Sequence, residues 1–138
     1  MELNQVIKKR NSIRGFKPIE LTGIKEMADK AATAPNAGGR RAYSFELVTD
    51  KDRIKELAQI AHQGWIATAS LVVVVKDEPE KSMSRYGERG RTYAIQDATL
   101  FLSYFDLLCV DRGWGTCWVG GFNTRRLNAL TMLVVGGI

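Results

Sequence analysis

The sequence predicts an α+β protein in which a mixed β-sheet is flanked by helices. Leu71–Val75 is a short, continuous run rich in β-branched residues, which is typical of a central strand buried on both faces. Tyr93–Cys109 carries apolar residues around a broad part of a helical circumference, which indicates a buried helix. With 138 residues, the chain is expected to form a single domain over residues 1–138.

The N-terminal third predicts two helices. Leu3, Val6 and Ile7 recur at the spacing of one helix face, and a second helix is expected over Gly23–Ala32 with Thr22 as its N-cap. The Pro, Asn and Gly residues of the next segment indicate a loop.

A strand and a third helix precede the central strand. Phe45, Leu47 and Thr49 alternate with polar residues, which predicts a strand. Asp50 follows as an expected N-cap, and the helix after it has the apolar stripe Ile54, Leu57, Ala58 and Ala61.

The remaining segments complete the expected sheet. Lys76–Arg91 is charged and polar, and it is expected to be an exposed excursion or a lid. Strands are expected at Thr116–Val119 and Met132–Val135, with a short helix between them that Asn123 or Thr124 caps and that ends at Leu130.

Composition and motifs exclude several classes of protein. The net charge of +5 comes from scattered lysines and arginines, which argues against nucleic-acid binding. One histidine (His62) and two cysteines (Cys109 and Cys117) without a CxxC motif make a zinc site improbable, and both thiols are expected to pack in a reducing compartment. No apolar stretch reaches the roughly 20 residues of a membrane span, so a soluble, cytoplasmic protein is expected.

No constellation of catalytic side chains is visible. The sequence lacks the glycine-rich dinucleotide motif and the P-loop, and it has no nucleophile elbow. Paired carboxylates such as Asp50 and Asp52 lie in segments that are expected to be exposed, where they are ordinary surface charge. His62 can be a general acid or base, but beside Gln63 and Gly64 it fits a polar loop residue better.

Three segments favour a bound ligand. Arg10–Arg14 gathers two guanidinium groups, an amide and a hydroxyl at a helix end, which suits an anionic group. Pro35–Arg41 and Gly115–Gly121 contain glycines that let a ligand approach the backbone closely. Each has a simpler alternative: a solvated helix end, an ordinary loop and a turn. Together they indicate a cofactor that carries the chemistry itself.

The order of these motifs resembles the FMN-dependent nitroreductase family. The resemblance extends from Ile7 to about Leu130, and the series of motifs is more specific than any one of them. The matching segments are Arg10–Arg14, Phe16–Pro18, Ala34–Gly39, Trp65–Ser70, Tyr93–Ala98 and Gly113–Phe122.

The resemblance implies a set of cofactor ligands. The first cluster would hold the FMN phosphate and ribityl chain, the loop after the second helix would lie beside the flavin or the partner subunit's flavin, and a glutamine would contact the ring system. The strand end would place a backbone N–H, that of Gly120, near flavin N5. The residues implied are Arg10, Asn11, Ser12, Arg14, Asn36, Ala37, Gly38, Gly39, Gln63, Val119, Gly120 and Gly121.

The resemblance also implies an activity and an assembly. The expected fold is a mainly antiparallel sheet in a homodimer, with FMN at the subunit interface and the Tyr93–Cys109 helix in that interface. The expected reaction is ping-pong hydride transfer from NADH or NADPH through FMN to a small acceptor such as a nitroaromatic or a quinone, with no catalytic side chain. The alternatives are a flavin-binding protein without turnover and a different flavin reaction such as dehalogenation.

Departures from the family pattern concern two places. Asn36 stands where serine is usual, and Arg41-Ala42-Tyr43 replaces a common Gln-Pro-Trp. Family members often continue past the last strand with a Lys or Arg that helps to clamp the phosphate, whereas this sequence ends at Ile138. This implies either a minimal, C-terminally short member that binds FMN more weakly, by about 1.5–3 kcal/mol for one charge-assisted contact, or a sequence from which segments are missing.

Overall fold

The structure is a computed structural model that describes all residues from Met1 to Ile138. Its helices are α1 (Leu3–Lys9), α2 (Ile24–Ala31), α3 (Lys51–Ile60), α4 (Pro79–Tyr86) and α5 (Arg89–Asp111), with short 3₁₀ turns η1 (Ala37–Gly39) and η2 (Gly64–Thr68). Its strands are β1 (Tyr43–Val48), β2 (Leu71–Asp77), β3 (Gly115–Val119) and β4 (Thr131–Gly136).

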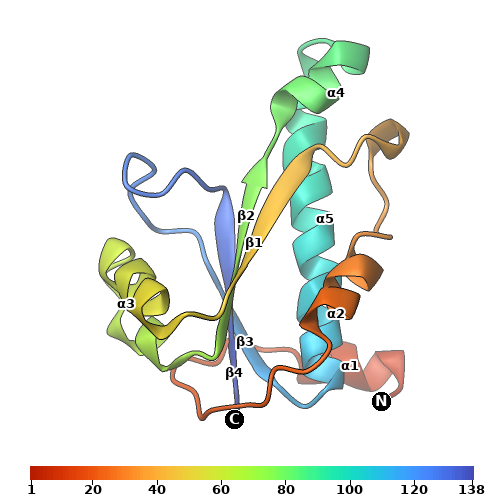
Figure 1. Ribbon diagram of the computed structural model, residues 1–138. Coiled ribbons are helices and arrows are strands. Elements are labelled where there is room, and N and C mark those ends of the chain that lie inside the picture. Colours follow the sequence, from red (N-terminus) through yellow and green to blue (C-terminus); the bar gives the residue numbers. More distant parts are fainter.

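The four strands form one sheet in the order β1-β2-β4-β3, with every neighbouring pair antiparallel. This confirms the α+β class and the mainly antiparallel sheet; the single parallel pairing is an isolated bridge between Ser12 and Thr116. The strand β2 is central, as the β-branched run predicts, and β3 lies at an edge. The sheet separates α1, α2 and α5 on one side from α3 on the other (Figure 1).

Burial on both faces explains why β2 is continuously apolar. Successive strand residues point to opposite faces. Val72 and Val74 pack in a core with α3 and η2, whereas Leu71, Val73 and Val75 pack in a second core against α2 and α5. The sheet therefore has no solvent-facing side at its centre, and both flanking layers are fixed to it.

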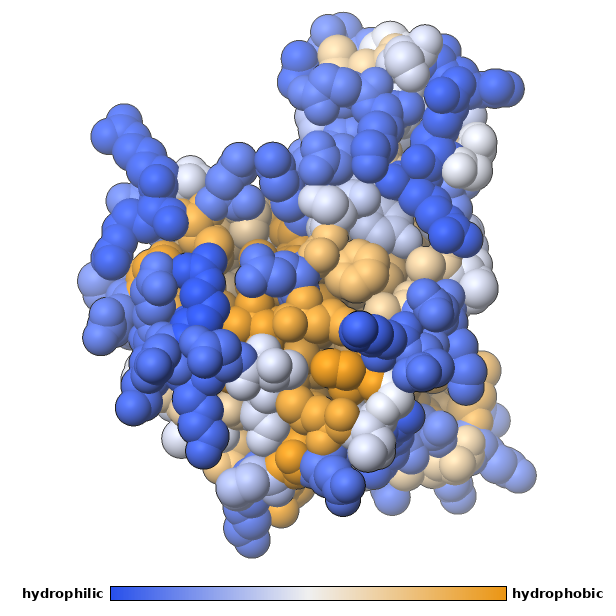
Figure 2. Space-filling model, viewed as in Figure 1, coloured by the Kyte–Doolittle hydropathy of each residue, from blue (hydrophilic) through white to orange (hydrophobic).

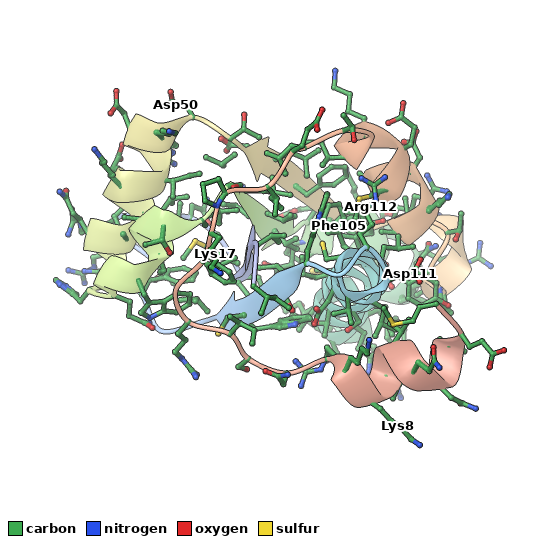
Figure 3. All side chains as sticks on the ribbon, turned by 90° about the horizontal axis from the view of Figure 1, so that it is seen from below. Lys8, Lys17, Asp50, Phe105, Asp111 and Arg112 are labelled. Atoms are coloured by element: carbon green, nitrogen blue, oxygen red, sulfur yellow. The ribbon has the colours of Figure 1, made fainter.

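The helix α5 is the longest element and supports one whole face of the sheet. Phe101 and Phe105 are fully buried in the second core, and Figure 3 shows Phe105 directed inward from α5. In the same view Asp111 and Arg112 mark the end of the helix. Asp111 binds the N-terminal amino group at 2.9 Å, and Arg112 donates a hydrogen bond to the carbonyl of Thr22.

One expected helix cap and one expected helix were wrong. Gly23, not Thr22, is the N-cap of α2; its φ of 72° is left-handed, and no side chain caps this helix. No helix forms between Asn123 and Leu130: the amides of Arg126 and Leu127 both turn back to the carbonyl of Asn123, and the chain then extends into β4. The Asn123 side chain accepts from the amide of Arg125, so a local turn satisfies the groups that a helix would have used.

The charged stretch Lys76–Arg91 is ordered as secondary structure. It completes β2, forms α4 with Pro79 at its first position and begins α5. Together α4 and the start of α5 project as a tip that is mostly hydrophilic in the space-filling view (Figure 2). Asp50 caps α3 as expected, because its carboxylate accepts the amide of Arg53 at 2.9 Å.

Candidate functional site

The outer edge of β3 has backbone groups that no other strand uses. The carbonyl of Thr116 accepts a hydrogen bond from the amide of Ile13 at 2.9 Å, so this carbonyl points away from β4. Inward and outward backbone groups alternate along an antiparallel strand, so Trp118 and Gly120 present theirs to the same outer edge. Beyond Thr116 this edge is unpaired and can bind an extended ligand.

Arg10–Arg14 lies at the beginning of this edge. The segment leaves α1 and bridges β3 through Ser12 and Thr116. Arg10, Asn11, Ser12 and Arg14 are all exposed. The guanidinium of Arg10 lies 4.0 Å from the carboxylate of Asp106, the amide of Asn11 donates to the carbonyl of Lys9, and the side chains of Ser12 and Arg14 have no partner in the chain.

The chain then crosses the end of the sheet. Lys17 pairs with Gly137 after β4, and the amide of Ile19 donates to the hydroxyl of Ser70 just before β2. The amide of Phe16 donates to the hydroxyl of Thr68 at 2.9 Å. These contacts fix the course of the chain around Arg14, which runs along the bottom of Figure 1.

Val119, Gly120 and Gly121 lie at the other end of the β3 edge. Val119 is buried, whereas both glycines are exposed and their amides donate to no group of the chain. A Cβ at Gly121 would meet nothing within 4 Å, and one at Gly120 would meet only the Thr131 hydroxyl at 4.0 Å. The backbone is therefore open to a flat ligand at this point. From Thr116 to Gly120 the edge is about 13 Å long.

The loop with Asn36, Ala37, Gly38 and Gly39 lies elsewhere, against the N-terminal half of α5 (Figure 1). The amide of Ala37 donates to Asp97 at 3.0 Å. The side chain of Asn36 closes its own loop, because its oxygen accepts the amide of Arg41 at 2.9 Å. Gly38 is left-handed, and a Cβ there would lie 2.4 Å from the hydroxyl of Tyr86, so the loop packs tightly against α4.

Gln63 lies on the α3 side of the sheet. Its oxygen accepts a hydrogen bond from the indole N–H of Trp65 at 3.1 Å, which leaves the amide nitrogen free. Gln63 borders an open hollow that also includes His62 and Arg126, from the turn after β3.

One chain therefore brings together only part of the expected site. The Arg10–Arg14 segment and the Val119–Gly121 segment share one edge strand. The loop at residues 36–39 is bound to Asp97 of α5, whereas β3 is bound to Asp106. These two aspartates are nine residues apart, at a rise of about 1.5 Å per residue, and lie on opposite sides of the helix.

Sequence reasoning missed two buried carboxylates on α5. Asp97 and Asp106 are each 2% exposed, and they support the loop and β3 respectively. The sequence offered one signal, which is a charged residue beside the apolar face of a helix that is expected to be buried. Because such residues are almost never buried without partners, each aspartate indicated a hydrogen-bonded contact with another segment. Asp97 stands in the Tyr93–Ala98 motif, but its position alone does not show which amides it accepts.

The remaining chemistry is sparse. Both cysteines are buried and free, and burial, with a smaller contribution from Asp106, raises the pKa of the Cys109 thiol well above its usual range. No group of three His, Cys, Asp or Glu side chains is placed to hold a metal ion. No helix combines the length and apolarity that crossing a membrane requires.

Solved structures share this fold. A nitroreductase family protein from Clostridium novyi NT superposes with a TM-score of 0.87 over 99% of this chain and 85% of its own, at 22% identity. A protein from Exiguobacterium sibiricum 255-15, provisionally assigned as a nitroreductase and solved with FMN, gives a TM-score of 0.88 over 99% of this chain and 88% of its own, at 14% identity.

The sequence comparisons agree with the fold. An Archaeoglobus fulgidus protein, provisionally assigned as an NADH dehydrogenase or NAD(P)H nitroreductase, is 26% identical over 137 residues, which are 96% of this chain and 76% of that protein. The profile of the Nitroreductase family matches residues 7–70 and 61–133. The chain therefore belongs to the nitroreductase family, and the resemblance stated from its motifs is confirmed.

Proposed function

We propose that this protein is an FMN-dependent NAD(P)H oxidoreductase that reduces small electron-poor acceptors such as nitroaromatics or quinones. The observation that carries the proposal is the open edge of β3, which has cationic and hydroxyl donors at one end and free backbone amides at the other. Family membership and a structural neighbour that contains FMN support the choice of cofactor.

The donor set fits FMN. The guanidinium groups of Arg10 and Arg14 and the hydroxyl of Ser12 are accessible and suit a phosphate, because arginine offers a fork of donors that matches its oxygens. Gly120 and Gly121 leave space for a flat ring against the backbone. When bound, FMN supplies the hydride chemistry.

The chain itself contributes position and electrostatics. Arg10, Ser12 and Arg14 would hold the anionic end of the cofactor at the start of β3. The amide of Gly120 would donate a hydrogen bond to the ring at the other end without any acidic side chain. Asn11 and Val119 would flank these contacts.

A second copy of the chain would complete the site. The loop at residues 36–39 is fixed to α5 away from the β3 edge, and we infer that it serves a site on a partner subunit. An apolar hollow of about 490 Å³ lies between α1 and α5, lined by residues that include Leu3, Ile7, Tyr104 and Leu107. Leu3 and Ile7 are 64% and 55% exposed beside this hollow, and we infer that a partner subunit covers them in a homodimer.

Anaerobic flavin reduction tests the proposal. Purified protein is loaded with FMN, freed of excess cofactor by gel filtration and mixed with NADH or NADPH without oxygen. We expect the visible flavin absorbance to bleach with at least one nicotinamide and to return when a quinone or nitroaromatic is added. The absence of bound FMN refutes the cofactor. Bound FMN that stays oxidised with both nucleotides refutes the reductase and indicates a flavin-binding protein without this turnover.

A further inference from the structure

Two buried carboxylates lie on opposite flanks of α5. Asp97 and Asp106 are separated by nine residues, which is two and a half helical turns, so their side chains leave the helix in opposite directions. Each is 2% exposed. A buried carboxylate is costly unless its oxygens are satisfied, so the groups that satisfy it show which segments it holds.

Asp97 holds both ends of the loop at residues 37–42. One of its oxygens accepts the amide of Ala37 at 3.0 Å, and the other accepts the amide of Ala42 at 3.2 Å. Between these anchors Arg41 has a φ of 46°, a left-handed conformation that is unfavourable for a residue other than glycine. The two bonds from Asp97 hold the chain in this conformation.

Asp106 holds the strand at the start of the candidate site. Its oxygens accept the hydroxyl of Thr116 at 2.6 Å and the indole N–H of Trp118 at 2.8 Å. The backbone of Thr116 in turn receives the amide of Ile13. The guanidinium of Arg10 lies 4.0 Å from the same carboxylate. Asp106 therefore contacts β3 and also faces a cation of the Arg10–Arg14 segment that pairs with β3.

Both positions use the full capacity of a carboxylate. Each aspartate uses its two oxygens to accept from two different donors. At Asp97 both donors are backbone amides, so Asp97→Asn directs an NH₂ group at one of them and removes a hydrogen bond while hardly changing the volume. At Asp106 an asparagine can still donate to the hydroxyl oxygen of Thr116, so Asp106→Asn instead removes the charge that strengthens both hydrogen bonds and that faces Arg10.

We propose that Asp97 and Asp106 are positioning residues that set the cofactor affinity of the site, Asp97 by fixing the loop at residues 36–42 and Asp106 by fixing Arg10 and the β3 edge. The proposal rests on the FMN function argued above and, for Asp97, on the homodimer in which its loop serves the partner's site. Neither residue touches the cofactor surface, because both are buried beneath the segments that they hold.

The test compares Asp97→Asn and Asp106→Asn with Asp29→Asn, a control at an exposed carboxylate on α2. Amide hydrogen exchange of the FMN-free protein is the first measurement. We expect the amides of Ala37 and Ala42 to exchange about tenfold faster in Asp97→Asn only, and the amide of Ile13 to do so in Asp106→Asn only. A purely structural defect would accelerate both segments in both variants and would overturn the proposal.

The second measurement is the dissociation constant for FMN, obtained from the quenching of flavin fluorescence. We expect it to rise about tenfold in each variant and to stay unchanged in Asp29→Asn. An unchanged constant in both variants overturns the positioning role in cofactor binding even if exchange is faster. If the wild-type protein binds no FMN, the proposed function fails, and the exchange pattern still decides whether the two carboxylates hold their segments.

Alternative substitutions serve if an asparagine variant does not fold. Trp118→Phe and Thr116→Val each remove one donor to Asp106 and leave the carboxylate in place. Asp97→Ser keeps one acceptor on a shorter side chain. The same segment-selective exchange and the same weakening of FMN binding are expected from these variants, and uniform or absent changes overturn the proposal.

Discussion

At the scale of single residues, Arg14 is the most direct test of the expected phosphate site. Its side chain is exposed and has no partner in the chain, so its removal should not affect folding. We expect Arg14→Ala to weaken FMN binding about 10- to 100-fold, as the loss of one charge-assisted contact predicts. Titration of flavin fluorescence measures this effect, and a thermal melt should show an unchanged midpoint.

Lys8→Ala is the matched control, because Lys8 points away from the body of the protein in Figure 3 and its loss removes the same charge. Equal weakening in both variants would mean that overall charge, and not contact, drives binding. Arg10→Ala combined with Arg14→Ala should abolish FMN retention during gel filtration while the protein stays folded. Full flavin occupancy in that double variant would contradict the phosphate assignment.

The sequence alone predicted the side chains that can donate to a ligand better than it predicted the buried residues that hold the site in place. The density of donors in Arg10–Arg14 is visible in the sequence, and the structure exposes these side chains. Asn36 looks equally available, yet its amide is used within its own loop. The roles of Asp97 and Asp106 depend on pairings across 55 and 60 residues and across 10 and 12 residues, and only the folded chain brings these partners together.

At the scale of elements, the crossing of α4 and α5 depends on Gly90. An added Cβ would lie 2.4 Å from the backbone nitrogen of Met83, so the two helices touch through this glycine. Helix propensity alone favours alanine by about 1 kcal/mol. We nevertheless expect Gly90→Ala to destabilise the protein by about 1–3 kcal/mol, because the backbones must separate.

Thermal unfolding measures this change, and a loss of 1 kcal/mol should lower the midpoint by about 3–5 °C in a domain of this size. Gly64→Ala is the control, since a Cβ there meets nothing within 4 Å and the backbone is not left-handed. Its midpoint should stay the same or rise. A Gly90→Ala midpoint as high as that of Gly64→Ala would show that the crossing adjusts without cost.

Hydrophobic periodicity correctly predicted the buried helices and strands. It failed where local hydrogen bonds determine the backbone conformation. The continuous run in β2 and the broad apolar face of α5 both reflect burial, which the sequence records directly. The turn after Asn123 and the left-handed cap at Gly23 depend on single backbone conformations that hydrophobic patterns do not encode. The order of the strands was likewise not readable, because it follows from pairings between distant segments.

At the scale of the whole molecule, the outer stripe of α5 predicts a dimer. Leu100 and Tyr104 are 37% and 40% exposed on the side of α5 away from the sheet, next to the hollow that α1 borders. A second copy covering this surface would bury apolar area and bring another chain's loop toward the β3 edge. We therefore expect Tyr104→Glu to weaken the dimer at least about 30-fold, as the loss of an interface hot spot does.

Sedimentation equilibrium of the FMN-free protein measures the dimer, and FMN titration of the same variant shows whether assembly completes the site. Ile95→Glu is the matched control, because Ile95 is similarly exposed, at 44%, but lies nine residues and therefore half a turn away around α5. If the dimer is lost and FMN binding weakens with it, the site depends on both chains. If Tyr104→Glu and Ile95→Glu leave the mass of the assembly equal to that of the wild type, the stripe is not the interface. A monomer that retains full FMN affinity would instead mean that the β3 edge of one chain binds the cofactor alone.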